Sequence, residues 1–332
     1  MGGIMRQARI KTPPEESEAV YHCISRTVNG EMLFDDVAKE VLRRQLWQVA
    51  DYCGVQVITY VIMGNHFHVL LRVPERRAIS DAELLRRYQV LYPRPTKYQA
   101  ARHETIKAEL TRNGAEAVQW RRCQLALMGD VSPFMKLLKQ RFSIWYNKSH
   151  RRFGTLWSER FKSVLVESAD RVLQTMAAYI DLNCVRAGLL FDPKEYRFCG
   201  YAEAVAGSKV AQDGIRSIIG GDGWSEVQAC YRELIFGTGA EARDAARIIP
   251  MADYEKVVAE GGRLPLATVL RCRIRYFTDG GVLGGRAFVA LQLAKYREKT
   301  GRCNHTEPRA VPRVVDWGDL STLRCLRQRS VG

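Results

Sequence analysis

Two histidines separated by one residue are the first candidates for chemistry. His66 and His68 follow the short break Gly64-Asn65 and begin an otherwise apolar run that ends at Val73. Residues i and i+2 of a strand point to the same face of a sheet, so a strand here places both imidazoles side by side. Because imidazole is a common metal ligand, the pair indicates a metal site. By itself such a pair is more often incidental, and a metal needs further ligands.

A second pair of candidates lies far downstream, on a predicted helix. Tyr179 and Asn183 are four residues apart, which places them on one helix face a turn apart. If this helix crosses the sheet face with the histidines, Asn183 offers an amide oxygen to the ion and Tyr179 stands beside it. A phenol has a pKa of about 10 and is a weak nucleophile, but nearby positive charge favours the phenolate. The predicted chemistry is attack on a phosphodiester that gives a covalent phosphotyrosine. The alternative is a core tyrosine with a satisfied hydroxyl.

The elements that position these residues follow from hydrophobic spacing and capping signals. Strands are expected at residues 19–26, 55–63, 66–73 and 159–167. Helices are expected from the capping pair Asp35-Asp36 to Gly54, from Ser132-Pro133 to His150, and from Asp170 to Gly188. A strand, a helix and two adjacent strands indicate an α+β unit with helices on one face of the sheet.

Other parts of the chain are expected around this unit. The predicted parts are an extended arm at 1–18, a core domain at 19–206 with a helical insertion near 75–130, a linker at 220–223, a mainly helical C-terminal domain at 224–300, and a basic, poorly ordered tail at 301–332. Within the C-terminal domain, 264–277 and 283–299 resemble two helices across a glycine turn. A helix-turn-helix DNA-binding unit has that outline, but so do many helical bundles.

The composition favours a nucleic-acid partner. The 332 residues include 51 Lys and Arg against 36 Asp and Glu, a net charge of +15 that suits a polyanion. Nine scattered cysteines without a Cys-x-x-Cys pair argue against disulfides or structural zinc and for a reducing cytosol. The first residues lack a signal peptide's apolar core, and no apolar run approaches the roughly 18 residues that span a membrane. We therefore expect a cytoplasmic protein with no membrane partner.

Basic residues near the predicted site are candidates for contacts with phosphate, although a solvated basic face has the same pattern. The candidates are Arg26, Lys136, Lys139, Arg141, Arg151, Arg152, Arg160, Lys162 and Arg186. His22, on the first predicted strand, is expected to be structural, although that strand could bring it beside the site.

Three motifs, in this order, resemble one known family. They are GNHFHVLL at 64–71, GTLWSERFKSVLVE at 154–167 and YIDLNCVRAGL at 179–189. Together they resemble the REP-associated tyrosine transposases, single-tyrosine members of the HUH nuclease family that are similar to transposases of the smallest insertion sequences. The first strand, 20–26, also fits. The resemblance covers roughly 17–205 apart from the insertion.

The resemblance implies both a fold and a reaction. The fold is a ferredoxin-like HUH core with an antiparallel sheet. His66 and His68 are implied to bind Mg²⁺ or Mn²⁺, with Asn183 completing the site. Tyr179 is implied to attack single-stranded DNA and to become joined to the 5′ phosphate, leaving a free 3′ hydroxyl. The implied substrate is DNA whose short palindromes fold into hairpins.

Two departures and one chemical conflict accompany this resemblance. Gly64 and Cys184 stand where the family usually has proline, and the second weakens the match beside Asn183. On ligand type alone, two imidazoles suit zinc, iron, nickel or copper better than magnesium. Magnesium and manganese become acceptable when phosphate oxygens and water fill the remaining positions.

Two other classes of function are kept open. One is a catalytically silent DNA-binding protein that recognises repetitive palindromes, and the other is a hydrolase of small phosphoesters. The second accounts for the two histidines but makes no use of the positive charge. The sequence does not predict the hairpin recognised or the oligomeric state.

Overall fold

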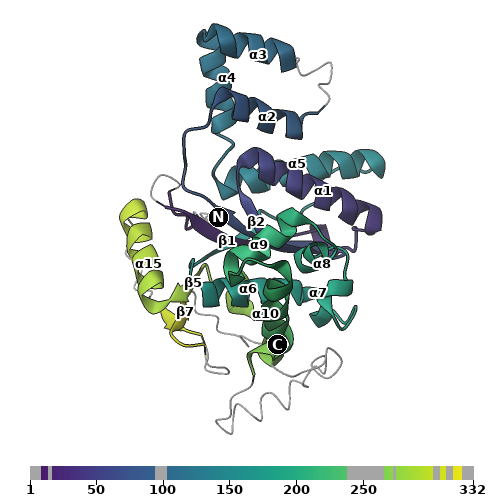
Figure 1. The fold of residues 1–332 in the computed structure, drawn as a ribbon, viewed down its shortest axis with the longest axis vertical. Coiled ribbons are helices and arrows are strands. Elements are labelled where there is room, and N and C mark those ends of the chain that lie inside the picture. The colour runs from purple at the N-terminus through teal and green to yellow at the C-terminus, as the bar shows by residue number, and fades with distance from the viewer. Residues whose placement is uncertain are drawn as a thin grey trace, which may run out of the picture.

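A mixed β-sheet runs through the protein, and the candidate histidines lie on its strands (Figure 1). The computed structural model describes residues 9–13, 17–93, 103–237, 265–271, 274–301, 307–311 and 317–323. Its strands, in chain order, are β1 (Ala19–Arg26), β2 (Gln56–Ile62), β3 (His66–Val73), β4 (Lys162–Val166), β5 (Val282–Gly285), β6 (Arg309–Ala310) and β7 (Leu320–Thr322). The order across the sheet is β2-β3-β1-β4-β5-β7-β6.

The first four strands form the predicted antiparallel core. β1 lies between β3 and β4, and β2 pairs with the outer edge of β3. Together with one helix between β1 and β2 and helices between β3 and β4, this is the ferredoxin-like arrangement. The predicted α+β class is therefore confirmed. The register of β1 with β3 places Ile24 opposite His68 and Arg26 opposite His66.

Two long helices cover one face of this core. α1 (Asp36–Cys53) begins where Asp35 accepts from the Ala38 amide at 2.7 Å and ends at Gly54 in the left-handed region, both as predicted. α5 (Val131–Ser149) packs against α1. Its cap is Asp130, which accepts from the Ser132 amide at 2.6 Å. The prediction of a Ser132 cap was therefore wrong, because the carboxylate two residues earlier takes that amide.

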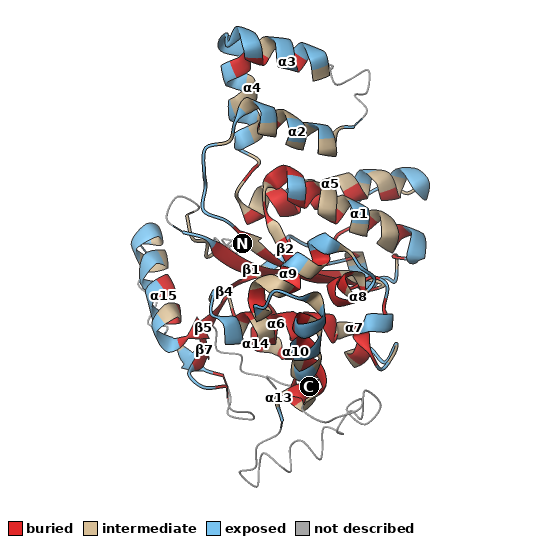
Figure 2. Ribbon diagram, in the orientation of Figure 1, coloured by how far each residue is buried: buried red, intermediate tan, exposed pale blue. Residues whose placement is uncertain are grey.

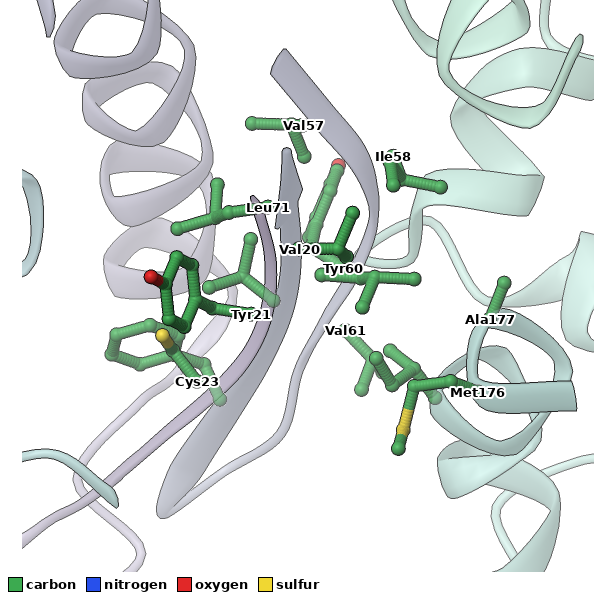
Figure 3. Packing of buried hydrophobic residues seen from close by; sticks show 14 of the residues in the cluster. Val20, Tyr21, Cys23, Val57, Ile58, Tyr60, Val61, Leu71, Met176 and Ala177 are labelled. Carbon is green, nitrogen blue, oxygen red and sulfur yellow. The ribbon is translucent and has the colours of Figure 1, made fainter. Parts of the chain in front are cut away.

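Helices also cover the opposite face of the sheet. The prediction of helices on one face only was therefore incomplete. α6 (Asp170–Asp181), α8 (Gly200–Val205) and α9 (Lys209–Ile219) contact strands of the sheet. α7 (Asn183–Arg186) and α10 (Trp224–Phe236) pack against α6. Figure 3 shows Tyr21 and Leu71 on the α1 side of the strands and Ile58 on the other side, where Met176 and Ala177 of α6 also lie. A strand that is apolar on both faces needs cover on both.

The insertion forms a small helical unit at the far end of the molecule (Figure 1). Its helices are α2 (Asp81–Leu91), α3 (His103–Arg112) and α4 (Ala115–Leu125). Ile106, Leu110 and Ala117 make a separate apolar cluster, and much of α3 and α4 is exposed (Figure 2). Two short 3-10 turns, Val28–Gly30 and Pro193–Glu195, complete the described elements before residue 237. Among the described helices, none combines the length and apolar character needed to cross a membrane.

The C-terminal part extends the same sheet. It contains α13 (Leu266–Val269), α14 (Arg275–Asp279) and α15 (Arg286–Thr300) besides β5, β6 and β7. Of the two helices expected across a glycine turn, the second is formed as α15, but it begins only at Arg286, because residues 282–285 form β5, which pairs in parallel with β4 through Val282 and Leu283. The segment expected as the first helix contains α13 and α14 as separate short helices. The Gly285 amide also donates to Glu167 at 2.7 Å.

The predicted division into domains stays a prediction. In the structure, the proposed linker at 220–223 is the turn between α9 and α10, which contact each other and α6. Parts of the predicted basic tail form β6 and β7, and residues 302–306, 312–316 and 324–332 lie outside the described residues.

Gly214 provides a test of how tightly α9 lies on β2. A Cβ atom here would stand 2.5 Å from the Ile58 carbonyl oxygen and 2.6 Å from that of Val57. Because both neighbours are backbone atoms of a buried strand, they cannot turn aside. We expect Gly214→Ser to lower the free energy of unfolding by about 2 kcal/mol or more, measured by urea denaturation. Gly223→Ser, at an open helix N-cap, is the matched control and should be neutral or slightly stabilising. Equal midpoints for the two variants would contradict this packing.

A candidate metal and tyrosine site

The two predicted metal ligands lie together at the start of β3. Their ring centroids are 5.2 Å apart. Both side chains leave the strand on the α6 side of the sheet, because His68 contacts His22 and Tyr179 of α6 also approaches His22. His66 is half-buried, whereas His68 is 3% exposed. The hairpin between β2 and β3 holds His66 at its end, because the Met63 amide donates to the His66 carbonyl at 2.8 Å. The predicted side-by-side placement is thus what the structure shows.

A third histidine joins this pair from the neighbouring strand. His22 Nε2 lies 2.8 Å from His68 Nδ1, and the two rings stack at 5.1 Å. The other nitrogen, His22 Nδ1, lies 2.7 Å from the carbonyl oxygen of Phe277 in α14. Sequence reasoning treated His22 as structural. Its place beside the site follows from the β1–β3 register, which puts His22 diagonally across from His68 on the same face of the sheet.

Tyr179 reaches the same face from α6. Its ring centroid lies 6.4 Å from that of His22 and 5.0 Å from that of Phe277, edge-on in both cases. The Arg186 guanidinium carbon sits 4.0 Å from the centre of the tyrosine ring. The side chain is only 2% exposed. The helix with Tyr179 therefore crosses the face of the sheet that carries the histidines, which was the condition set by the sequence.

Asn183 begins the next helix. The helix predicted at 170–187 is interrupted at Leu182, so Tyr179 ends up near the end of α6 and Asn183 at the first position of α7. At this break Arg186 donates from one nitrogen to the Tyr179 carbonyl at 2.7 Å and from another to the Leu270 carbonyl at 2.7 Å. Asn183 is half-buried. Its role as a ligand stays a prediction.

Burial keeps the inner imidazoles neutral. It lowers the pKa of His22 to about 4, although the hydrogen bond to the Phe277 carbonyl acts in the opposite direction. Burial also places the pKa of His68 well below its usual range, and the neighbouring His22 and His66 add to this. A neutral imidazole has a lone pair on one nitrogen, which is the state a metal requires.

The donor set fits a divalent ion that brings ligands of its own. Within the described ranges, no group of three or more His, Cys, Asp or Glu side chains is arranged to hold a metal. The predicted ligands are the imidazoles of His66 and His68, which lie together, and the amide oxygen of Asn183, whose place in the set stays a prediction. This set leaves room for phosphate oxygens and water, which is how magnesium and manganese are commonly held.

Sequence reasoning missed Asp181, a buried carboxylate two residues after Tyr179. It accepts from the Thr59 hydroxyl at 2.7 Å, from the Tyr231 hydroxyl at 2.6 Å and from the Tyr201 amide at 3.4 Å. Complete burial raises the pKa of Asp181 to about 7, against the effect of these donors. The carboxylate thus joins α6 to β2, α8 and α10. Its partners are distant in the chain, so no local signal marks it.

The candidate DNA contacts divide into two groups. Arg26, Lys136, Arg151, Arg160 and Lys162 are exposed. The others are at least partly engaged within the protein: Lys139 with the Glu159 carbonyl, Arg141 with the Leu91 carbonyl, Arg152 with Glu31, and Arg186 as described above. Burial lowers the pKa of Lys139 to about 8. Lys162 also lies 3.1 Å from Asp279 of α14.

Comparison with known proteins supports the resemblance over part of the chain. Residues 15–89 match the family model described as "Transposase IS200 like". The matched part contains all three site histidines, and this confirms the predicted relationship to IS200-like transposases there. The helices that carry Tyr179 and Asn183 lie beyond the matched residues. No curated protein gave a match.

The chain is also similar to solved structures. One of them is described as a REP-associated tyrosine transposase bound to a REP hairpin, with 13% sequence identity and a TM-score of 0.38. The similarity covers 67% of this chain and 93% of that one.

Loss of the Asp181 carboxylate should destabilise the protein. Asp181→Ala leaves the hydroxyls of Thr59 and Tyr231 without their acceptor and opens a small cavity. We expect a loss of about 2–4 kcal/mol in the free energy of unfolding, measured by chemical denaturation. Asp213→Ala, on an exposed face of α9, is the control and should change stability by less than about 0.5 kcal/mol. A loss at Asp181 no larger than at Asp213 would show that the network does not hold α6 in place.

Proposed function

We propose that this protein cleaves and rejoins single-stranded DNA at hairpin-forming sites through a covalent bond between Tyr179 and a 5′ phosphate. The observation that carries the proposal is the meeting of Tyr179 with the histidine cluster. The tyrosine ring lies 6.4 Å from His22, which is itself bonded to His68. The transposase match over residues 15–89 and the net charge of +15 support a DNA substrate.

The proposed reaction assigns one role to each residue. His66, His68 and Asn183 hold Mg²⁺ or Mn²⁺, which when bound supplies polarisation of the scissile phosphoryl group. The Tyr179 oxygen attacks phosphorus and its proton passes to solvent, while the bond from phosphorus to the 3′ oxygen breaks and that oxygen takes up a proton from solvent. The products are a 5′ phosphotyrosine and a free 3′ hydroxyl. Attack by a 3′ hydroxyl on the phosphotyrosine reverses these bond changes and joins strands.

Arg186 is placed to assist this chemistry. Its guanidinium lies over the face of the Tyr179 ring at 4.0 Å, a cation–π contact that places positive charge beside the proposed nucleophile. The same side chain is held by two backbone carbonyls, from Tyr179 and Leu270, so the charge has a fixed position. We therefore assign Arg186 a role at the tyrosine in addition to any contact with phosphate.

The tyrosine is covered in the structure, and the covering segment must shift for DNA to reach it. Phe277 of α14 packs edge-on against the Tyr179 ring, and Tyr179 is 2% exposed. α14 is joined to the core by the Lys162–Asp279 pair at 3.1 Å. This cover also favours a second candidate, a DNA-binding protein that recognises hairpins without cutting them. Strong hairpin binding with no adduct under any divalent metal would select that alternative.

Tyr179→Phe should abolish covalent attachment. We expect wild-type protein incubated with 5′- and 3′-labelled hairpin DNA and Mn²⁺ to form an adduct that survives denaturing electrophoresis and carries the 3′ part of the strand. Tyr179→Phe should form none, because the attacking oxygen is absent, yet should bind the hairpin as wild type does. Tyr88→Phe, in the insertion, serves as the control. Adduct at the wild-type level in Tyr179→Phe would exclude this residue as the nucleophile.

Loss of a proposed metal ligand should mimic removal of the metal. A chelator should stop adduct formation, and added Mn²⁺ or Mg²⁺ should restore it. We expect His66→Ala to lower the rate at least about 100-fold, because one of two imidazole ligands is gone. His150→Ala, at the exposed end of α5, should leave the rate within about twofold. Unchanged activity in His66→Ala would refute the metal assignment.

Neutralising Asp279 should strengthen DNA binding. Asp279→Asn removes the closer of two carboxylates from Lys162 and leaves the pair with Glu159 at 3.8 Å, so Lys162 is more available to phosphate. We expect tighter binding of single-stranded DNA and a salt dependence steeper by about 0.7 in log–log slope, measured by fluorescence anisotropy. Asp213→Asn makes the same change in net charge on α9, away from Lys162 in the sequence and paired with Arg216. Equal effects of the two substitutions would mean that only net charge matters.

A further inference from the structure

Each of the two proposed histidine ligands is held by a short hydrogen-bond relay that ends on a backbone carbonyl. Asn65 links His66 to the carbonyl of Gly30, and His22 links His68 to the carbonyl of Phe277. A carbonyl oxygen can only accept a hydrogen bond. Each relay therefore has a direction, and that direction decides which nitrogen of the histidine carries a proton.

The relay through Asn65 fixes the tautomer of His66. Asn65 donates from Nδ2 to the Gly30 carbonyl at 2.9 Å, which turns its Oδ1 toward His66 Nδ1 at 2.6 Å. Since Oδ1 is an acceptor, Nδ1 of His66 must be the donor. The proton of neutral His66 is thus on Nδ1, and the lone pair is on Nε2.

The relay through His22 fixes the tautomer of His68 in the same way. His22 Nδ1 donates to the Phe277 carbonyl at 2.7 Å, so Nε2 of neutral His22 is an acceptor. The partner at 2.8 Å, His68 Nδ1, is then the donor. The lone pair of His68 is therefore also on Nε2.

The opposite arrangement would disable His68 as a ligand. A doubly protonated His22 would donate from both nitrogens, and His68 Nδ1 would have to accept. The proton of neutral His68 would then sit on Nε2 and block it. In the structure His22 is fully buried with a carbonyl oxygen at Nδ1 and an imidazole nitrogen at Nε2, and a neutral imidazole with one donor and one acceptor satisfies both partners.

We propose that His22 is a positioning residue that presents Nε2 of His68 to the metal, with its own orientation set by the Phe277 carbonyl of the C-terminal segment. This inference rests on the proposed metal site and extends it. A metal-binding histidine commonly donates its other N–H to an oriented acceptor, and here that acceptor is a second imidazole. The metal site thus depends on residues from both ends of the chain, β1 and α14.

The tautomers can be measured directly, without metal or DNA. Full-length protein labelled with ¹⁵N-histidine is examined by long-range ¹H–¹⁵N correlation at neutral pH, with signals assigned from single substitutions. We expect His22, His66 and His68 each to carry the proton on Nδ1. A His68 protonated on Nε2 would overturn the inference. This result does not depend on DNA cleavage.

Two substitutions at His22 separate positioning from packing. His22→Gln keeps an acceptor for His68 Nδ1, whereas His22→Leu keeps only the bulk. We expect Mn²⁺ affinity, measured by electron paramagnetic resonance titration, to fall about 10–100-fold in His22→Leu and to stay within about threefold of wild type in His22→Gln. Thermal unfolding is measured without metal as well. If His22 had only a structural role, both variants would unfold at a lower temperature and both would keep the wild-type affinity for Mn²⁺.

The outcomes distinguish this inference from the proposed function. His22→Leu that binds Mn²⁺ as tightly as wild type overturns the positioning role, and so does His22→Gln that loses affinity as severely as His22→Leu. If His22→Leu does not fold, the tautomer of His68 in wild type and the affinity of His22→Gln decide. Normal Mn²⁺ binding without any DNA adduct counts against the proposed function alone.

Discussion

The antiparallel pairing of β1 with β3 is the constraint on which the site depends. With Ile24 opposite His68, His22 lies diagonally across from His68 on one face, and Tyr21 and Leu71 point to the other side. Because side chains alternate along a strand, a slip of one residue would turn the histidines toward the α1 layer. The dense apolar packing on both faces penalises such a slip, so the core that stabilises the fold also fixes the chemistry.

Buried polar groups lock the second helical layer in a single position. A buried donor or acceptor without a partner costs roughly 1–3 kcal/mol, so each polar side chain on this face specifies what must pack beside it. His22 requires the carbonyl of α14, and Asp181 requires hydroxyls from β2 and α10. Apolar contacts alone would tolerate small sliding of α6 over the sheet. These hydrogen bonds do not, and they hold Tyr179 at the histidines.

The features that the sequence predicted correctly are those that depend on residues close together in the chain. Strands β1 to β4, the Asp35 cap and the shared face of His66 and His68 followed from alternation and capping, with no knowledge of tertiary contacts. The errors came from partners distant in the chain. His22 acquires its role from Phe277, and residues 282–285 became a strand because the edge of β4 was available. The predicted cap at Ser132 was a local error, because the Asp130 carboxylate two residues earlier accepts the Ser132 amide and caps the helix instead.

Phe277 of the C-terminal segment makes two contacts at the candidate site that have opposite consequences. Its carbonyl lies against His22, which contacts the proposed ligand His68, while its ring packs against Tyr179. Under the proposed roles, the segment that prepares His68 for an ion is also the segment that covers the proposed nucleophile. Movement of α14 away from Tyr179 would take the Phe277 carbonyl away from His22 as well, so exposing the tyrosine and orienting the histidine would compete.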